Sequence, residues 1–459
     1  MDSLNIIDTD LISIQEARIL AENAGRVRRP MSEMPQEKLD RIAGAMLNAV
    51  LPHAVELAEL AYNETEMGVE KDKLFQIRFV CEKLYKEMNN MRCVGVISMD
   101  EEKRMMDVGA PIGPIAAFCP VTNPVATTVY NAAIAAKSGN PIIFSPHPRA
   151  RKSMTRTLEI LAEAAAAAGM PEGGFSWLSR ATMGGSLELM NHNAISLIIV
   201  TGVPGIIPAA KTSGKPVIVG GLGDGPAFIE KTANVKKAVR DVIASKTFDF
   251  GVVSAAEQSV VVDRPIESQV RMEFESQGAY FMKPSESEDL GKLFYDRKGK
   301  VVRELVGVSA QTLARKAGFV VPPSVRVLIS EQKYVTEDNP YSKEKLCPVL
   351  AYFVEDDWRD ACEKCIELLL SEHKGHTLVI HSNDGEVIMQ FALKKPVARI
   401  LVNTPAVFGS MGLTTNLFPA MTLGSALTGE GITSDNVSPM NLVYIRKVGY
   451  GVREIDSAE

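Results

Sequence analysis

The sequence has few of the features that mark membrane, secreted or nucleic-acid-binding proteins. No apolar run approaches the roughly twenty residues that a membrane-spanning helix needs, and the acidic N-terminus lacks the basic start of a signal peptide. Six cysteines in 459 residues are too few to indicate a disulfide framework. The net charge is −6, from 50 basic and 56 acidic residues without a basic block, which disfavours nucleic acid as a partner. We therefore expect a cytoplasmic protein that binds neither membrane nor nucleic acid.

What the chain does have is length and a regular alternation of segment types. A chain of 459 residues is longer than one hydrophobic core normally serves, so we expect two domains. Apolar residues at spacings of three and four predict helices through the first ninety or so residues. From Pro111 to Gly221, short apolar runs alternate with helical patterns, which is typical of a parallel sheet covered on both faces. We predict a Rossmann-like nucleotide-binding domain there.

A second α/β domain is predicted over roughly 247–405, where the alternation begins again. The runs KLFYD and LARKAGF within it look helical. The tail LVYIRKVGYGVRE alternates apolar and charged residues, which suits an edge strand or a strand paired with another subunit.

Two loops are candidates for binding phosphate. SPHPRA, Ser145–Ala150, lies where a predicted strand ends and a helix begins, the place where an α/β sheet binds nucleotide. Arg149 offers a phosphate partner, although a rigid turn with a surface arginine explains the same residues equally well. GGLGDG, Gly220–Gly225, lacks the G-x-G-x-x-G spacing and precedes a strand-like run. We favour a glycine turn that needs unusual backbone angles.

The pair Cys362 and Cys365 has the C-x-x-C spacing of many zinc sites. A zinc site needs about four ligands, no second cysteine pair exists, and the nearby histidines are His373, His376 and His381. Both cysteines lie in an amphipathic helical pattern. We interpret them as core residues of a helix and predict no metal.

Asn123 and Ser254 are candidates for catalysis, and each has a structural alternative. Asn123 begins a predicted helix, where an asparagine caps the helix or helps its terminus stabilise an oxyanion; the cap is the simpler interpretation. Ser254 lies in an apolar turn before the strand SVVVD, and it is a nucleophile only if a base is nearby. No G-x-S-x-G elbow surrounds it. The residues alone favour a structural serine.

A set of ordered segments is spread over nearly the whole chain: ETEMGVEKDK, PIGPIAAFCPVTNP, IIFSPHPRA, TGVPG, SGKPVIVGG, KTFDFGVVSAAEQSVVV, KEKLCPVLA, GHTLVIHS, NTPAVFGSMG, TLGSALTG and SDNVSPMNL. Together these segments resemble one family, the CoA-acylating aldehyde dehydrogenases. The resemblance implies the aldehyde dehydrogenase fold: a cofactor-binding domain over 1–245, a catalytic domain over 246–410, and a segment over 411–459. That last segment would return to the cofactor domain and supply an oligomerisation strand to a homodimer or homotetramer.

The resemblance implies a mechanism and a set of site residues. A cysteine thiolate attacks the aldehyde, hydride leaves to NAD(P)+, and CoA takes the acyl group from the enzyme thioester. An asparagine amide supports the oxyanion, and the matching residue is Asn123. Hydrolytic relatives carry a glutamate base just before a Gly-Gly pair, whereas no carboxylate directly precedes Gly220 here, which fits release of the thioester by CoA. Positions that match cofactor contacts are Ser145, His147, Pro148, Arg149, Gly202, Gly205, Gly221 and Glu344.

The chain departs from the family at the catalytic residue itself. Ser254 stands where the family has its cysteine, and because a hydroxyl has a far higher pKa than a thiol, thioester chemistry should be nearly lost. Two explanations remain open, an engineered Cys→Ser variant, which we favour, and a natural inactive relative. Rival functions are a non-catalytic protein that binds nucleotide or CoA, and a serine hydrolase or transferase that would need a base the neighbouring sequence does not offer.

Further departures concern substrate and cofactor. Phe250 stands where bifunctional relatives usually have asparagine, and TLGSALTG lacks the cysteine and tryptophan of their TLGCGSWG. We expect a small anionic aldehyde, sulfoacetaldehyde ahead of succinate semialdehyde, rather than acetaldehyde. SPHPRA lacks the glutamate with which many NAD-preferring relatives bind ribose hydroxyls. Because Arg149 would instead face a 2′-phosphate, we expect NADP slightly ahead of NAD.

Overall fold

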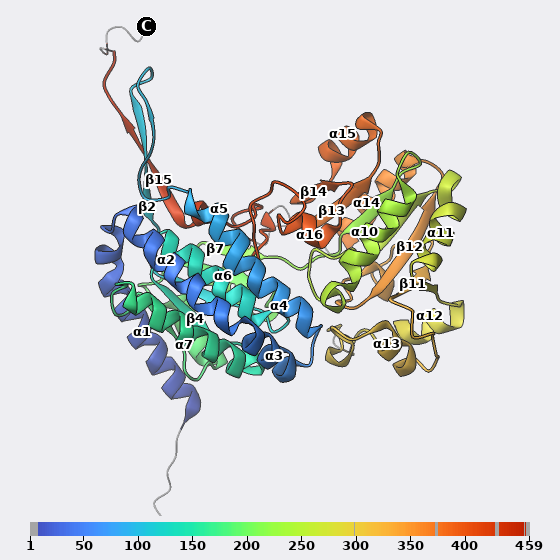
Figure 1. Cartoon of the computed structure of the whole chain (residues 1–459), viewed down its shortest axis with the longest axis horizontal. Helices are drawn as coiled ribbons and strands as arrows, with labels where there is room; N and C mark the ends of the chain where they lie inside the picture. The colour runs from blue at the N-terminus through green and yellow to red at the C-terminus, as the bar shows by residue number, and fades with distance from the viewer. Residues whose placement is uncertain (1–7, 298, 372–374, 427–430, 454, 456–459) are drawn as a thin grey trace, which may run out of the picture. The chain divides into compact units, whose positions relative to one another are not determined.

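Two compact units make up the computed structural model (Figure 1), which describes residues 8–297, 299–371, 375–426, 431–453 and 455. The first unit comprises Met1–Leu57, Gln76–Ile218 and Val437–Glu459. The second comprises Ala58–Phe75 and Val219–Asn436. The predicted α/β architecture is confirmed in both units, because each is built around a sheet of parallel strands.

These units divide the chain differently from the expected ranges 1–245, 246–410 and 411–459. Residues 58–75 and 219–245 belong to the second unit, and the C-terminal tail joins the first unit only from Val437. Helix α10 (Val235–Thr247) illustrates the reason, since its apolar face packs in the core of the second unit. The functional roles of the expected ranges stay a prediction.

A five-stranded sheet with the order β5-β4-β3-β6-β7 forms the centre of the first unit, as predicted for a Rossmann-like domain. β3 pairs in parallel with both β4 and β6, so that Ile115 lies beside Ile142 on one side and Leu197 on the other. Between β5 and β6 the chain passes from one side of β3 to the other. That crossing makes the carboxyl ends of β3 and β6 the topological switch point, where such sheets bind ligands. The strands are β3 (Ile115–Phe118), β4 (Ile142–Ser145), β5 (Phe175–Trp177), β6 (Leu197–Thr201) and β7 (Val217–Gly220).

Helices predicted through the first ninety or so residues are confirmed. In the first unit α2, α6 and α7 contact one another, and α1 contacts α8. Every residue of α6 is buried. Most are apolar, and among the polar ones Thr128 Oγ1 donates to the carbonyl of Pro124 and Lys137 Nζ to Asp40 Oδ1, each at 2.6 Å. The helices of this half of the chain are α1 (Thr9–Ser32), α2 (Gln36–Val50), α3 (Ala54–Thr65), α4 (Glu70–Arg78), the π-helix η2 (Phe79–Leu84), α5 (Tyr85–Asn89), α6 (Pro124–Lys137), α7 (Arg151–Ala167), α8 (Met183–Asn191) and α9 (Ile207–Thr212), with 3₁₀ turns η1 (Leu51–His53), η3 (Pro148–Ala150) and η4 (Pro204–Ile206).

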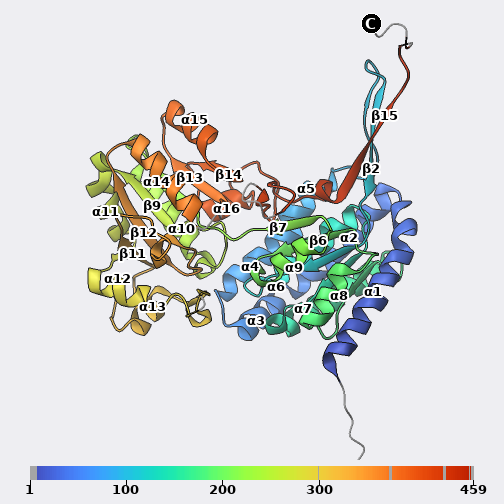
Figure 2. The ribbon, with the colours of Figure 1, turned by 180° about the vertical axis from the view of Figure 1, so that it is seen from behind.

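A three-stranded antiparallel sheet completes the first unit, and Figures 1 and 2 show it as a long ribbon beside the helices of that unit. Its strands are β1 (Gly95–Asp100), β2 (Met105–Pro111) and β15 (Val443–Gly449). β15 confirms the strand predicted in the tail and pairs with β2 along its whole length. Tyr444 and Ile445 are 54% and 40% exposed, so this sheet presents apolar side chains at its surface.

The second unit contains a seven-stranded parallel sheet with the order β10-β11-β12-β9-β8-β13-β14. Successive side chains of one strand enter opposite layers, as strand geometry requires. Val260 and Val262 pack with α10, α11 and α16, whereas Val261 packs with α12, α13, α14 and α15. The strands are β8 (Pro226–Ile229), β9 (Ser259–Asp263), β10 (Ala279–Phe281), β11 (Val327–Glu331), β12 (Val349–Glu355), β13 (Thr377–His381) and β14 (Arg399–Val402).

Helices cover both faces of this sheet, and one predicted helix is absent. KLFYD, expected to be helical, forms a turn that leads to an isolated bridge between Tyr295 and Val301. Cys362 and Cys365 lie on α14 with their side chains in the core, which confirms the core interpretation. None of the helices in the described part of the chain combines the length and apolar character that a membrane crossing requires. Besides α10, the helices are α11 (Glu267–Ser276), α12 (Pro284–Gly291), α13 (Ala310–Lys316), α14 (Trp358–Ser371), α15 (Gly385–Lys394) and α16 (Ala406–Ser410), with 3₁₀ turns η5 (Phe248–Gly251), η6 (Arg264–Ile266), η7 (Arg303–Leu305) and η8 (Pro340–Ser342). The 3₁₀ turn η10 (Pro439–Leu442) belongs to the first unit.

Candidate active site

Ser254 lies in the turn between η5 and β9, as the sequence predicted. Its side chain is half-buried, whereas every residue of β9 is buried. The turn packs against the segment KEKLCP, because a Cβ on Gly251 would lie 2.9 Å from the carbonyl oxygen of Cys347. Gly251 also has a φ of +74°, which glycine adopts without steric cost. The candidate nucleophile is therefore presented by a tightly packed turn in front of a rigid buried strand.

Two consecutive residues of η5, which leads into this turn, have strained backbones. Asp249 and Phe250 have φ of 49° and 50° with ψ of 35° and 36°, in the left-handed region. A residue other than glycine loses about 1–2 kcal/mol there, and asparagine tolerates the region better than phenylalanine does. Such strain persists only where surrounding contacts impose it, and it clusters at functional sites.

The loop Gly220–Gly225 joins two of the predicted site residues. A Cβ on Gly223 would lie 1.8 Å from the carbonyl oxygen of Ser254, so the loop is in contact with the backbone of the candidate nucleophile. The N–H of Gly223 donates to Glu344 Oε1 at 2.9 Å. Ser254 and Glu344, distant in sequence, therefore meet through one glycine.

The glycines of this loop correct one expectation. Unusual backbone angles were expected, yet none of the loop's glycines has a positive φ. Glycine is required here because other atoms approach the backbone closely. A Cβ on Gly221 would lie 2.5 Å from Ser425 Oγ, and one on Gly225 would lie 1.9 Å from the carbonyl oxygen of Thr377. Gly221, predicted to contact cofactor, packs against the segment TLGSALTG.

Buried ionisable groups surround the strand that follows Ser254. The side-chain oxygen of Gln258 accepts from Lys246 Nζ and from the N–H of Lys345, both at 3.1 Å. Burial raises the pKa of the Glu257 carboxyl to about 7. Burial, with the nearby charge of Lys345, lowers the pKa of Lys246 to about 7. Both pKa values therefore lie near neutral pH, where each group changes its charge.

His376 is a neighbour of the site that sequence reasoning considered only as a zinc ligand. Its ring lies 3.6 Å from the position of a Cβ on Gly221, and Nδ1 is 2.9 Å from Thr377 Oγ1. Burial, and secondarily Arg399, hold the pKa of the imidazole well below its usual range. The ring is therefore neutral at neutral pH and supports the glycine loop by packing. Its only signal in the sequence was its position directly before a buried strand.

In the first unit, a pocket of about 360 Å³ lies at the carboxyl ends of β3, β4 and β6. That volume falls within the usual range for ligand pockets, about 300–1,000 Å³. Gly202 does not line the pocket, but its φ is +59° and a Cβ there would lie 3.0 Å from Pro120 Cβ. The predicted cofactor residues that line the pocket are Ser145, His147, Pro148, Arg149 and Gly205.

The polar groups of this pocket are held in place by local hydrogen bonds. Ser145 Oγ lies 2.9 Å from Ser186 Oγ, and His147 Nδ1 accepts from the N–H of Arg149 at 3.2 Å. The side chain of Arg149 is exposed at the pocket. An adjoining pocket of about 400 Å³ is lined by Arg151 and Arg180. Neither arginine was predicted from the sequence, because Arg151 lies inside a helical pattern and Arg180 follows a short strand. Together the arginines favour a phosphorylated ligand.

Asn123 occupies the N-cap position of α6, but its side chain makes no capping hydrogen bond. The simple cap interpretation is therefore wrong. The amide nitrogen of Asn123 instead donates to Oε1 of the buried Gln76. An amide nitrogen carries two N–H donors, so Gln76 orients the group while one donor is left for another partner. Gln76 had no recognisable signal in the sequence.

The cysteines offer no substitute nucleophile among the described residues. All six are free and buried. Cys119 lines the pocket of the first unit, and burial raises the pKa of its thiol to about 11. A thiol with so high a pKa contains almost no thiolate at neutral pH. In the described ranges, no group of three or more His, Cys, Asp or Glu side chains is placed to hold a metal.

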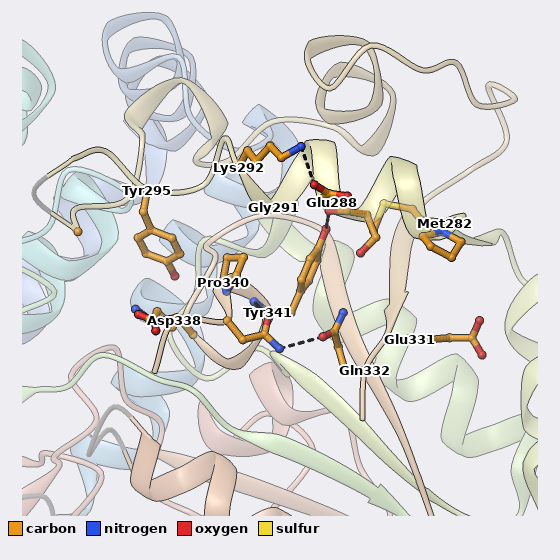
Figure 3. A pocket seen from close by; sticks show the side chains of 15 residues that line it. Met282, Glu288, Gly291, Lys292, Tyr295, Glu331, Gln332, Asp338, Pro340 and Tyr341 are labelled. Carbon is orange, nitrogen blue, oxygen red and sulfur yellow. Dashed lines mark hydrogen bonds and ion pairs between the residues drawn. The ribbon is translucent and has the colours of Figure 1, made fainter. Parts of the chain in front are cut away.

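The second unit has a larger pocket of about 660 Å³ (Figure 3), where the hydroxyl of the lining residue Tyr295 donates to the carbonyl oxygen of Glu344 at 2.7 Å. None of the predicted site residues lines it. Its polar side chains pair with one another: Lys292 Nζ is 2.8 Å from Glu288 Oε1, and Asn339 Nδ2 donates to Gln332 Oε1 at 2.8 Å. We assign this pocket no ligand.

The predicted site residues are therefore distributed over both units. Asn123 and the loops of the 360 Å³ pocket belong to the first, and Ser254, Gly221 and Glu344 belong to the second. The first unit holds an oriented amide and an arginine-lined pocket, and the second holds a packed turn beside a carboxylate.

Comparison with known proteins gives a consistent family. The family model described as "Aldehyde dehydrogenase family" matches residues 3–414. The chain is 36% identical to the bifunctional aldehyde-alcohol dehydrogenase of Escherichia coli over 95% of its own length and 49% of that protein. It thus spans about half the length of the first curated relatives it matches. It is also 30% identical to the succinate-semialdehyde dehydrogenase (acetylating) of Clostridium kluyveri, over 96% of this chain and 97% of the relative.

Solved structures agree. A probable aldehyde dehydrogenase from Listeria monocytogenes is 42% identical with a TM-score of 0.95, over 99% of this chain and 100% of the other. An acetylating aldehyde dehydrogenase from Geobacillus thermoglucosidasius is 38% identical with a TM-score of 0.94, over 98% and 99%. Similarity of this extent, over both units, confirms the resemblance found in the sequence.

Proposed function

The chain belongs to the aldehyde dehydrogenase family, and from that premise we propose that it is built to convert a small aldehyde into its acyl-CoA with NAD(P)+. The acetylating relatives from Clostridium kluyveri and Geobacillus thermoglucosidasius support this reaction. The residues proposed to carry it are residue 254 as the nucleophile position, Asn123 as the oxyanion donor and Glu344 as the ribose-binding carboxylate.

One observation supports transfer of the acyl group to CoA rather than to water. The loop Gly220–Gly225 contacts the backbone of Ser254, and the residues before its glycine pair, Val217–Val219, are apolar and buried. A glutamate in that stretch is what would activate water against the thioester in hydrolytic relatives. Without such a base, an external thiol is the better acceptor of the acyl group.

The chain's own residues have these proposed tasks. In a cysteine form, the residue-254 thiolate would bond to the aldehyde carbon while the Asn123 amide, oriented by Gln76, donates to the oxygen that gains negative charge. Bound NAD(P)+ would supply the acceptor for the hydride that leaves the former aldehyde carbon. Loss of that hydride would turn the adduct into the residue-254 thioester. CoA sulfur would then bond to the acyl carbon and release the residue-254 sulfur. Glu344 already accepts from Gly223, and a carboxylate accepts several hydrogen bonds.

Ser254 bears on whether this chain turns over. A serine hydroxyl is a poor nucleophile without a base. Lys246 Nζ donates to Gln258 Oε1, and Oε1 of Glu257 accepts from the N–H of Ala406, so these bonds are to partners other than Ser254. We therefore propose that the chain is inactive as a Cys→Ser variant. The second candidate, a natural non-catalytic protein that binds nucleotide or CoA, rests on Ser254 itself. The retained Asn123 and Glu344 favour the first, because relaxed selection should erode more than one position.

Substrate, cofactor preference and assembly are the finer parts of the proposal. We propose sulfoacetaldehyde ahead of succinate semialdehyde, with acetaldehyde third, since Phe250 alters the pocket expected for acetaldehyde. Arg149, with Arg151 and Arg180 in the adjoining pocket, favours the 2′-phosphate of NADP over NAD. The exposed apolar side chains of β15 favour association into a homodimer or homotetramer. We propose the cytoplasm as its location.

The test is CoA-dependent NAD(P)H formation by this chain and by its Ser254→Cys variant on the three aldehydes. Activity only in the cysteine form would establish residue 254 as the nucleophile position and rank the substrates. If both forms are silent while nucleotide still binds, the enzyme proposal fails and the binding-protein proposal replaces it.

A further inference from the structure

The segment Glu66–Lys73, here called the anchoring segment, is part of the run ETEMGVEKDK and has no role in the proposed chemistry. It lies among the N-terminal helices in sequence, between α3 and the first turn of α4. By contact, however, it belongs to the second unit, with the turn that carries residue 254. Its contribution to the second unit follows from its contacts with Asp249.

The anchoring segment holds the side chain of Asp249. The Asp249 carboxylate is completely buried; it accepts from the N–H of Val69 at 2.7 Å and forms an ion pair with Lys73 Nζ at 3.2 Å. Lys73 is itself only 2% exposed. In return, the N–H of Asp249 donates to Asp72 Oδ2 at 2.8 Å. A buried carboxylate is tolerated only when it is paired and hydrogen-bonded in this way.

Close packing fixes the same contact sterically. Gly68 has a φ of +80°, and a Cβ there would lie 1.9 Å from Asp249 Oδ1. The N–H of Gly68 donates to the carbonyl of Gly307 at 2.8 Å, and the N–H of Gly307 donates to the carbonyl of Leu346 at 2.9 Å. Leu346 lies two residues after Glu344. One chain of contacts thus joins Asp249 to the loop of the ribose-binding carboxylate.

Backbone strain is concentrated along these contacts. Non-glycine residues with positive φ in the described chain include Glu66, Asp249, Phe250 and Leu346, beside Arg104 and Asn403. The first four belong to the anchoring segment or to the turns it joins. Strained conformations persist only where neighbours impose them, and the contacts of Val69, Asp72 and Lys73 with Asp249 are such a constraint.

An aromatic cluster supports the contact on its apolar side. Phe75, just beyond the anchoring segment, packs edge-on against Phe248 with ring centroids 5.7 Å apart. Phe248 in turn packs against Phe408 at 5.0 Å. The residue directly before Asp249 is therefore held as well, and the start of the turn has little freedom.

We propose that Asp249 is a positioning residue for the nucleophile: held by Val69, Asp72 and Lys73 of the anchoring segment, it fixes the turn that aims the side chain of residue 254. The inference rests on the proposed function, because it assigns residue 254 as the nucleophile position. The contacts of Asp249 described above are with the anchoring segment, and it acts on residue 254 through the backbone between 249 and 254.

The test compares two double variants in the Ser254→Cys chain, Lys73→Met with Asp249→Asn and Lys73→Met with Asp249→Ala. Both lack the ion pair, so neither leaves a buried charge alone. They differ in that asparagine can accept from Val69 N–H and tolerates the left-handed region, whereas alanine cannot accept. Phe391→Leu, which disturbs a stacked ring pair elsewhere in the second unit, is the control for general destabilisation. All are measured well below their melting temperatures.

The readouts are the rate at which iodoacetamide alkylates the introduced thiol at position 254 and kcat for the aldehyde. We expect the asparagine variant to stay within about threefold of the parent and the alanine variant to lose at least about thirtyfold in kcat, with a changed alkylation rate. Equal alkylation and kcat in the two double variants, with only their melting temperatures differing, would overturn the proposal. Should the Ser254→Cys chain lack CoA-dependent activity, the proposed function fails separately, because alkylation still tests the anchoring of the turn.

Discussion

Gly223→Ala is the substitution whose effect follows most directly from the structure. The added Cβ would lie 1.8 Å from the carbonyl oxygen and 2.9 Å from the carbonyl carbon of Ser254. Both atoms are backbone, so no side-chain rotation relieves the overlap. Either the loop or the turn of residue 254 must move, and movement of the loop also breaks the hydrogen bond from Gly223 to Glu344, now 2.9 Å long.

Overpacking of a well-packed interior costs about 1–3 kcal/mol, and a clash with backbone belongs at the upper end. A loss of about 3 kcal/mol in a unit of this size lowers the melting temperature by about 6–12 °C. Gly385→Ala is the matched control in the same unit, because nothing lies within 4 Å of its Cβ position. Thermal unfolding followed by circular dichroism measures both. A Gly223→Ala protein that melts within about 1 °C of the parent would refute the packing of this loop on residue 254.

Two further predictions concern cofactor and pH. Arg149→Ala should raise KM or Kd for NADP by about tenfold or more and leave NAD within about twofold, because a guanidinium–phosphate bond contributes about 1.5–3 kcal/mol; titration with both nucleotides checks this, with the exposed Arg26→Ala as control. Burial raises the pKa of Glu257 from 4.5 to about 7, so its contribution to stability is complete below about pH 4.5 and is lost as pH rises to about 7. Because glutamine does not ionise, Glu257→Gln should avoid that loss and raise the free energy of unfolding in urea at pH 7.5 by at most about 3 kcal/mol. An unchanged pH profile would contradict the assignment.

Much of the fold follows from local patterns in the sequence. β4, β6, β9 and β13 are buried on both faces of parallel sheets, and such strands appear as short continuous apolar runs. The helices of the first ninety or so residues were equally visible from their spacing. The helix predicted for KLFYD is wrong because its apolar residues lie in a turn and an isolated bridge. Periodicity over five residues cannot distinguish that arrangement from a helix.

The residues of the candidate site were predicted from the sequence, but the contacts between them were not. The resemblance supplied Ser254, Asn123 and Glu344 as candidates, whereas nothing in the sequence indicated that Gln76 holds Asn123 or that Gly223 joins the other two. The glycine-rich loop shows the difference: its composition predicted a turn, but the reason for glycine was the approach of the Ser254 backbone and not its own backbone angles.

The sequence by itself determined the two α/β sheets and the family, and it supplied Ser254 as the candidate nucleophile position, because apolar periodicity and ordered motifs are local properties of the chain. Tertiary structure alone decided that residues 58–75 belong with the second unit, that Asp249 is buried against Lys73, and that Glu257 and Lys246 are taken out of water. Those features depend on which distant segments meet, and the free energy of a buried charge or a missing Cβ is set by the atoms that surround it in space.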